Sequence, residues 1–140
     1  MATSANQWCI DTSVAVAALD ATHEAHVACR TAAQLHRPAL AGHAAFETYS
    51  VLTRLPGVAR VSPLVAATAI TSAFPDRCWL TSAQHERLIN RLAKLGIEGG
   101  MVYDALVGEA ARNSGRRLLT RDVRALRVYD LLEVHVDFVN

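Results

Sequence analysis

Four acidic residues beside apolar segments are the candidates for chemistry in this sequence. Asp11 follows the apolar run Trp8-Cys-Ile, Glu47 and Asp104 lie within helix-like segments, and Asp122 follows Leu118-Leu-Thr-Arg. Carboxylates that cluster repel one another unless a cation compensates them. Oxygen ligands with few imidazoles favour Mg²⁺ or Mn²⁺, which polarise phosphoryl oxygens and lower the pKa of bound water. The predicted chemistry is therefore metal-dependent hydrolysis of a phosphodiester.

Each of these acids also has a purely structural explanation. Asp11 and Asp122 could cap the helices that follow them, and Glu47 and Asp104 stand where acids favour the helix dipole. Only the convergence of all four residues at one place favours a metal site over four separate caps.

The elements that must position these acids are short apolar strands alternating with helices. We expect strands at 7–11, 37–41, 78–80, 117–120 and 134–139, and helices at 14–19, 23–34, 43–55, 63–74, 82–95, 101–113 and 123–130. Such alternation is typical of a parallel sheet covered by helices on both faces. We predict a single domain over residues 1–140, a three-layer α/β/α fold with a mostly parallel five-stranded sheet. Trp8 and Trp79, which lie in predicted strands, are expected in the core.

The predicted topology brings the four acids to one edge of the sheet. Asp11 and Asp122 follow strands, and the carboxyl ends of parallel strands form the edge where ligands bind. A helix that follows a strand begins at this edge, which places Glu47 about one turn from it. Asp104 lies in the first turn of a helix that leads down to the fourth strand, so it begins there too. His43 is expected at the rim of the same pocket.

Composition excludes several classes of protein. The chain has 140 residues, 51% of them hydrophobic, and a formal net charge of +1. Intrinsic disorder is therefore excluded, and no apolar run reaches the roughly 20 residues of a membrane span. The first residues lack the basic stretch of a signal peptide, and the three cysteines form no C-x-x-C pair. We expect a cytoplasmic protein with reduced, mostly buried thiols and no membrane association.

Arginines concentrate near the C-terminus. Residues 112–127 contain six arginines against one acid, Asp122, and thirteen of the fourteen cations in the chain are arginine. Arginine suits bidentate contacts with phosphate, so Arg116 and Arg121 are predicted to bind an RNA backbone. A codon bias toward arginine and a solvated helix face remain alternative explanations.

Four motifs carry a resemblance to a known family. They are Asp11-Thr-Ser, Ala45-Phe-Glu47, Gly99-Gly-Met-Val-Tyr-Asp104-Ala-Leu-Val and Leu118-Leu-Thr-Arg-Asp122. Their order and approximate spacing over nearly the whole chain resemble those of the PIN-domain nucleases, and most closely the VapC toxins of bacterial toxin–antitoxin modules. The resemblance implies Mg²⁺-dependent cleavage of single-stranded or structured RNA, with Mn²⁺ as a substitute, and inhibition of translation and growth. It also implies a homodimer and a cognate VapB antitoxin that blocks the site.

The resemblance assigns roles to individual residues. Asp11 and Asp104 would be the main Mg²⁺ ligands, and Glu47 and Asp122 would complete the pocket directly or through water. Ser13 and Thr120 would be hydrogen-bond partners of these ligands. Some PIN domains carry a further acid or Asn shortly after the fourth strand. Val123 and Arg124 stand there in this chain, which argues against a fully occupied second metal site.

Other functions fit the sequence less well. A receiver-type signalling domain would need an acidic pair after the first strand, an Asp after the third and a Lys after the last, and all three are missing. No P-loop and no G-x-G-x-x-G occurs, which argues against a nucleotide-cofactor enzyme. A catalytically silent PIN-type module that binds RNA, and a PIN nuclease of RNA processing outside a toxin–antitoxin pair, remain open.

Overall fold

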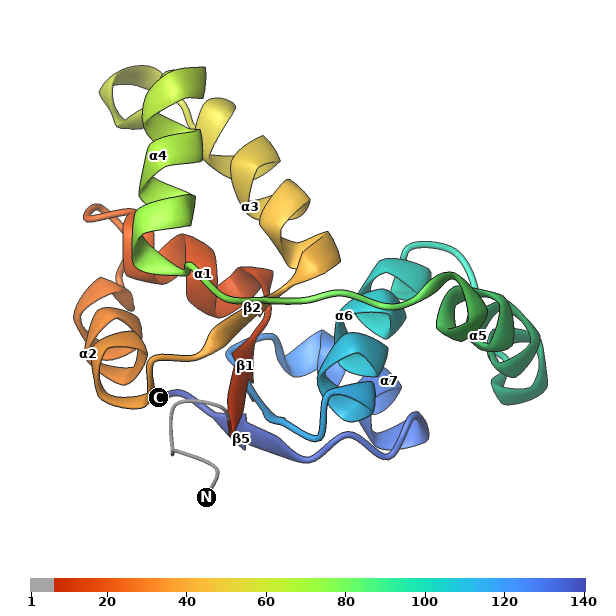
Figure 1. Ribbon diagram of the computed structural model, residues 1–140. Coiled ribbons are helices and arrows are strands. Elements are labelled where there is room, and N and C mark those ends of the chain that lie inside the picture. The colour runs from red at the N-terminus through yellow and green to blue at the C-terminus, as the bar shows by residue number, and fades with distance from the viewer. Residues whose placement is uncertain (1–6) are drawn as a thin grey trace.

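The computed structural model describes residues 7–140 and contains one five-stranded sheet with helices around it (Figure 1). The strands follow the spatial order β3-β2-β1-β4-β5, and every neighbouring pair is parallel. Their bounds are β1 (Trp8–Ile10), β2 (Ala39–Ala41), β3 (Arg77–Cys78), β4 (Arg117–Thr120) and β5 (Val136–Phe138). The prediction of an α/β fold with a largely parallel five-stranded sheet is confirmed, and the sheet is parallel throughout.

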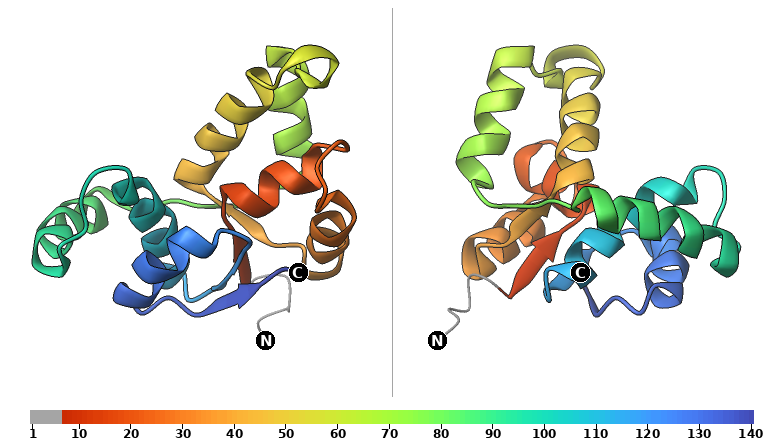
Figure 2. Two further views of the ribbon diagram at one scale, coloured as in Figure 1. Left: turned by 180° about the vertical axis from the view of Figure 1, so that it is seen from behind. Right: turned by 45° about the vertical axis from the view of Figure 1, so that its right-hand side comes forward.

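Within residues 7–140 the strands are accompanied by seven α-helices. They are α1 (Thr12–Leu19), α2 (His26–His36), α3 (Gly42–Thr53), α4 (Pro63–Ala73), α5 (Ser82–Leu95), α6 (Met101–Asn113) and α7 (Leu126–Leu131). Helices α1 and α2 lie on one side of the strands and α6 and α7 on the other, which gives the three layers (Figure 1). The α3–α4 pair projects from this body, and α5 lies out beyond α6 (Figure 2).

Local signals explain how the elements next to the acids begin and end. The Asp11 carboxylate accepts a hydrogen bond from the Val14 amide and so caps α1 directly after β1. Asp122 caps the 3₁₀ turn Val123–Ala125 in the same way after β4. Helix α5 begins with a capping box at Thr81 and ends at Gly96, whose left-handed conformation suits glycine. The two capping acids thus lie at the carboxyl ends of neighbouring strands.

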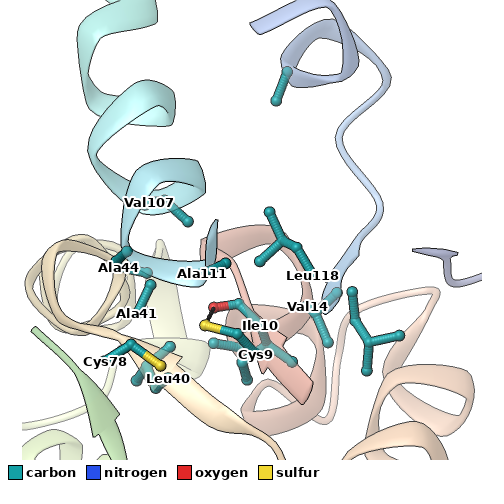
Figure 3. Packing of buried hydrophobic residues seen from close by; sticks show 14 of the residues in the cluster. Cys9, Ile10, Val14, Leu40, Ala41, Ala44, Cys78, Val107, Ala111 and Leu118 are labelled. Carbon is teal, nitrogen blue, oxygen red and sulfur yellow. Dashed lines mark hydrogen bonds between the residues drawn. The ribbon is translucent and has the colours of Figure 1, made fainter. Parts of the chain in front are cut away.

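Small apolar residues allow the helices to lie close to the sheet. Figure 3 shows Ile10, Leu40 and Leu118 from three adjacent strands packed with Val107 and Ala111 of α6. All three cysteines are buried and free, as predicted. None of the helices within residues 7–140 is long and apolar enough to cross a membrane.

Four sequence-based expectations need correction or lie outside the described residues. The third strand is Arg77–Cys78 rather than 78–80, and α2 begins at His26 rather than at residue 23. The expectation that Trp79 belongs to the core is wrong, because the chain leaves the sheet after Cys78 and the Trp79 side chain is 60% exposed. Trp8 is half-buried. The interpretation of the N-terminus concerns residues 1–6, which lie outside the described residues.

Candidate active site

The four predicted acids line one cleft of about 480 Å³ at the carboxyl edge of the sheet. Asp11 reaches it from the end of β1, Glu47 from α3, Asp104 from the first turn of α6, and Asp122 from the turn after β4. Since these segments are far apart in the sequence, the cleft depends on the parallel topology that brings their ends together.

Asp11 is the most deeply buried of the acids, with 3% of its surface exposed. One carboxylate oxygen, Oδ1, accepts hydrogen bonds from the Ser13 hydroxyl at 2.5 Å and from the Val14 amide at 3.3 Å. The other, Oδ2, accepts from the hydroxyls of Thr120 and Tyr129. Burial raises the pKa of Asp11 above its ordinary value, and these donors offset part of the rise. The carboxylate is therefore held rigidly in one orientation.

Ser13 and Thr120 connect the two strand ends through Asp11. The Ser13 hydroxyl donates to Asp11 and accepts from the Arg121 amide at 2.8 Å. The Thr120 hydroxyl donates to Asp11 and accepts from the Asp122 amide at 3.0 Å. Both hydroxyls thus donate to Asp11, and they also accept from the backbone amides of Arg121 and Asp122.

Asp104 carries the clearest electrostatic sign of a shared acidic site. Partial burial, followed by repulsion from Asp122, Glu47 and Asp11, raises the pKa of Asp104 to about 6, while Arg124 counteracts the rise. A cation bound among these carboxylates would offset their repulsion and so stabilise the ionised form of Asp104.

Glu47 and Asp122 remain partly exposed in the cleft. Glu47 Oε1 accepts from the Thr12 hydroxyl at 3.0 Å and lies 3.9 Å from His43 Nε2. Asp122 Oδ1 accepts from the Arg124 amide at 3.0 Å and lies 3.9 Å from the Arg124 guanidinium. Each residue thus has a second carboxylate oxygen for which no hydrogen bond is found within residues 7–140.

The four acids of the cleft offer the kind of ligand atom that a hard divalent cation binds. The donor set consists of carboxylate oxygens alone, the type that Mg²⁺ and Mn²⁺ prefer. Within residues 7–140, however, no three His, Cys, Asp or Glu side chains already lie close enough together to hold an ion. A cation shared by the four acids would therefore need their carboxylates to lie closer together than they do here.

Tyr129 belongs to the site although the sequence did not point to it. Its hydroxyl donates to Asp11 Oδ2 at 2.9 Å from α7, and the side chain is almost completely buried. Burial and the Asp11 carboxylate raise the pKa of Tyr129 well above its ordinary value, so the phenol stays protonated and donates. A short helix that contains a tyrosine carries no local sign of such a contact, and only tertiary packing reveals it.

The two arginines predicted to bind RNA lie in different places. Arg121 lines the acidic cleft, where its Nη1 donates to the Val139 carbonyl at 2.7 Å. Arg116 instead donates to Cys78 Sγ at 2.6 Å and lines a separate hollow with Arg112 and Arg117. Arg124, which no motif singled out for RNA, lines the acidic cleft.

Comparison with known proteins agrees with the fold and with this cleft. Residues 8–131 match the model of the PIN domain. The chain is 48% identical over 128 residues to Ribonuclease VapC27 of Mycobacterium tuberculosis strain H37Rv, covering 91% of this chain and 93% of the relative. It is 44% identical over 132 residues to Ribonuclease VapC40 of the same species, covering 92% and 96%. This chain therefore belongs to the PIN-domain family, as a VapC-type nuclease.

Proposed function

We propose that this protein is a Mg²⁺-dependent endoribonuclease that acts as the toxin of a type II toxin–antitoxin module. The observation that carries the proposal is the convergence of Asp11, Glu47, Asp104 and Asp122 on one cleft. The relatives of similar length carry the names of VapC ribonucleases, which supports RNA as the substrate. Cleavage of cellular RNA would inhibit translation and growth.

The four carboxylates would hold the ion, with Asp11 and Asp104 as its main ligands. When bound, a divalent cation supplies a water of lowered pKa and polarises a phosphoryl oxygen. The protein contributes the orientation of Asp11, which Ser13, Thr120 and Tyr129 hold through their hydroxyls. Arg121 and Arg124 at the cleft would bind the RNA phosphates on either side of the cleaved bond.

Catalysis by this cleft is tested by replacing the two main ligands. Asp11→Asn and Asp104→Asn should each lower Mg²⁺-dependent cleavage of total RNA at least about 100-fold, or roughly 2.7 kcal/mol of activation free energy. Both changes keep the shape of the side chain while they remove the charge that holds the ion. Cleavage assays with Mg²⁺, Mn²⁺ and EDTA would measure the loss.

Asp130→Asn is the matched control, because Asp130 is an exposed acid of α7 outside the cleft. It should cleave like the parent protein. Parental activity in Asp11→Asn or Asp104→Asn would refute the assignment. RNA binding without cleavage in the parent protein would instead indicate a catalytically silent RNA-binding module.

We also propose a VapB-type antitoxin as partner, a homodimer as the assembly and the cytoplasm as the location. Support for the antitoxin comes from the VapC names of the relatives and from Val27 and Leu35, two apolar side chains of α2 that lie exposed. A large exposed apolar surface is typical of a partner site. Co-expression with the protein encoded beside this chain, followed by light scattering and a cleavage assay, would test the complex, its stoichiometry and its inhibition of the nuclease.

A further inference from the structure

Three aromatic side chains lie exposed beside the acidic cleft. Phe46 is 66% exposed, Trp79 60% and Tyr103 52%, although such rings are usually at least half buried in a folded protein. Phe46 and Trp79 line a hollow of about 210 Å³, which we call the aromatic hollow. Its other lining residues are Gly42, His43, Cys78, Leu80, His85, Leu106 and Ala110.

Trp79 packs directly against Gly42. The indole lies so close to this glycine that a Cβ there would overlap the ring. The segment between α4 and α5, which carries Trp79, passes across the beginning of α3 (Figure 1 and Figure 2). Phe46 meets the indole edge to face, with the ring centroids 6.2 Å apart and an interplanar angle of 61°. The two rings are thus held in place against the fold while most of their surface stays open to solvent.

The aromatic hollow adjoins the acidic cleft. The His43 ring stacks on Tyr103 with a centroid distance of 5.3 Å and an interplanar angle of 10°. His43 is one helical turn before Glu47, and Tyr103 directly precedes Asp104. His43 lines the hollow, and its Nε2 lies 3.9 Å from Oε1 of Glu47 in the acidic cleft, so the His43–Tyr103 pair lies between the two sites.

We propose that the aromatic hollow is a binding subsite for one unpaired nucleobase of the RNA substrate, next to the phosphate that occupies the acidic cleft. This inference rests on the proposed function. Every base has a π-face, so it stacks on aromatic rings whatever its sequence, and single-stranded or looped RNA presents such bases. The hollow is also polar at its margin: His85 Nδ1 lies 2.9 Å from the Thr81 carbonyl, and a proton on Nδ1 leaves Nε2 as an acceptor. Exposed rings together with imidazoles suit a base better than a purely apolar protein helix.

The test compares two ligands of equal charge in EDTA, where cleavage is off. One is an unstructured 12-nucleotide RNA of A, C and U, and the other is its abasic analogue with the same phosphates. The parent protein should bind the RNA more tightly than the analogue. Trp79→Ala and Phe46→Ala should each weaken RNA binding roughly fivefold or more and leave binding of the abasic analogue unchanged.

Three further variants separate stacking from structural damage. Trp79→Phe should retain most of the affinity. Gly42→Ala should weaken RNA binding without deleting any ring, because the new Cβ displaces the indole. Leu64→Ala removes an exposed apolar side chain of α4 outside the hollow and should bind like the parent protein. Thermal melting of each variant would confirm that it folds.

Three results would overturn the subsite. The first is a parent protein that binds both ligands equally. The second is a pair of ring variants that bind RNA like Leu64→Ala. The third is a Trp79→Ala variant that changes the mass in light scattering but keeps RNA binding, which would make this face an interface between two copies of the chain. The cleavage assay with Asp11→Asn stands apart from all three, so failure of the nuclease proposal is distinguishable from failure of the subsite.

Discussion

At the scale of the residue, burial and neighbouring charge act in the same direction on Asp104. Its pKa rises from the ordinary 3.8 to about 6 in the folded protein. Between these two values the folded state binds more protons than the unfolded state, so stability falls as the pH rises through this window. Above pH 6 Asp104 is ionised, and the metal-free protein is destabilised by the full repulsion between the carboxylates. A cation should therefore bind most tightly above pH 6 and more weakly in acid, where Asp104 is protonated.

Asp104→Asn should therefore stabilise the metal-free protein at pH 7.5. We expect a gain of roughly 1 kcal/mol, because partial solvent exposure screens much of the repulsion. The gain should vanish at pH 3, where the carboxyl group is neutral in both states. Thermal melting in EDTA at both pH values would measure it, and Mg²⁺ should then stabilise the parent protein more than the variant. A variant that melts at or below the parent temperature at pH 7.5 would contradict this account.

Tyr129 supplies the second residue-scale prediction. Tyr129→Phe removes one donor from the buried Asp11 carboxylate, and a hydrogen bond to a charged group contributes roughly 1.5–3 kcal/mol. The variant should lose stability of this order. Because the lost donor lowered the pKa of Asp11, that pKa should rise further, and the acid limb of the cleavage profile should move to higher pH. Denaturant unfolding and a pH–rate profile would check both effects, and an unmoved acid limb would exclude Tyr129 from positioning Asp11.

At the scale of the element, α6 connects the cleft to the packing beneath it. Asp104 lies in its first turn, and Gly108, one turn later, packs against Tyr129 and Val134. Only a glycine leaves room there, because a Cβ at Gly108 would lie 2.9 Å from the Tyr129 ring. The closeness of α6 to α7 thus brings the phenol within reach of Asp11. Glu109 pairs with Arg91 of α5, which holds α5 on α6, and with Arg112 within α6 itself.

Gly108→Ala should therefore disturb the site without changing a polar residue. We expect a net destabilisation of about 1 kcal/mol, since overpacking costs roughly 1–3 kcal/mol and alanine recovers up to about 1 kcal/mol of helix propensity. RNA cleavage should fall as the Tyr129 hydroxyl moves from Asp11. Gly100→Ala, at the start of the same helix, meets no atom within 4 Å and serves as the control in melting and cleavage assays. Equal stability of Gly108→Ala and the parent would contradict the packing argument.

At the scale of the whole molecule, the arginines are divided between two surfaces. Arg121 and Arg124 line the acidic cleft, whereas Arg116 lies in a hollow with Arg112 and Arg117. A net charge of only +1 therefore includes one separate basic hollow, and two further arginines that lie among the carboxylates of the acidic cleft.

The salt dependence of RNA binding should reveal which region contacts phosphate. Each phosphate neutralised on a single strand contributes about 0.7 to the slope of log affinity against log salt. Arg121→Gln should reduce the slope by about this amount, and a parental slope would remove Arg121 from the interface. If Arg116 binds the RNA backbone, as the sequence predicts, Arg116→Gln should reduce the slope by the same amount. A reduced slope would show that the RNA reaches the hollow that Arg112, Arg116 and Arg117 line. An unchanged slope would show that the RNA does not contact Arg116.

Much of the site could be predicted because the residues that form it mark the ends of elements. Asp11 and Asp122 follow apolar runs, and parallel strands separated by helices bring their carboxyl ends to one edge. Sequence order and element type therefore determined the α/β fold and the shared cleft of Asp11, Glu47, Asp104 and Asp122.

Only the tertiary structure decided the contacts that depend on the direction of a side chain or the close approach of two helices. It showed that Tyr129 donates to Asp11, that Trp79 lies exposed on Gly42, and that Arg116 turns away from the acids toward Cys78. A short apolar run containing a tryptophan has the same pattern whether it enters a sheet or leaves it. Which of the two occurs depends on contacts with residues far away in the sequence, and a local pattern contains no information about those contacts.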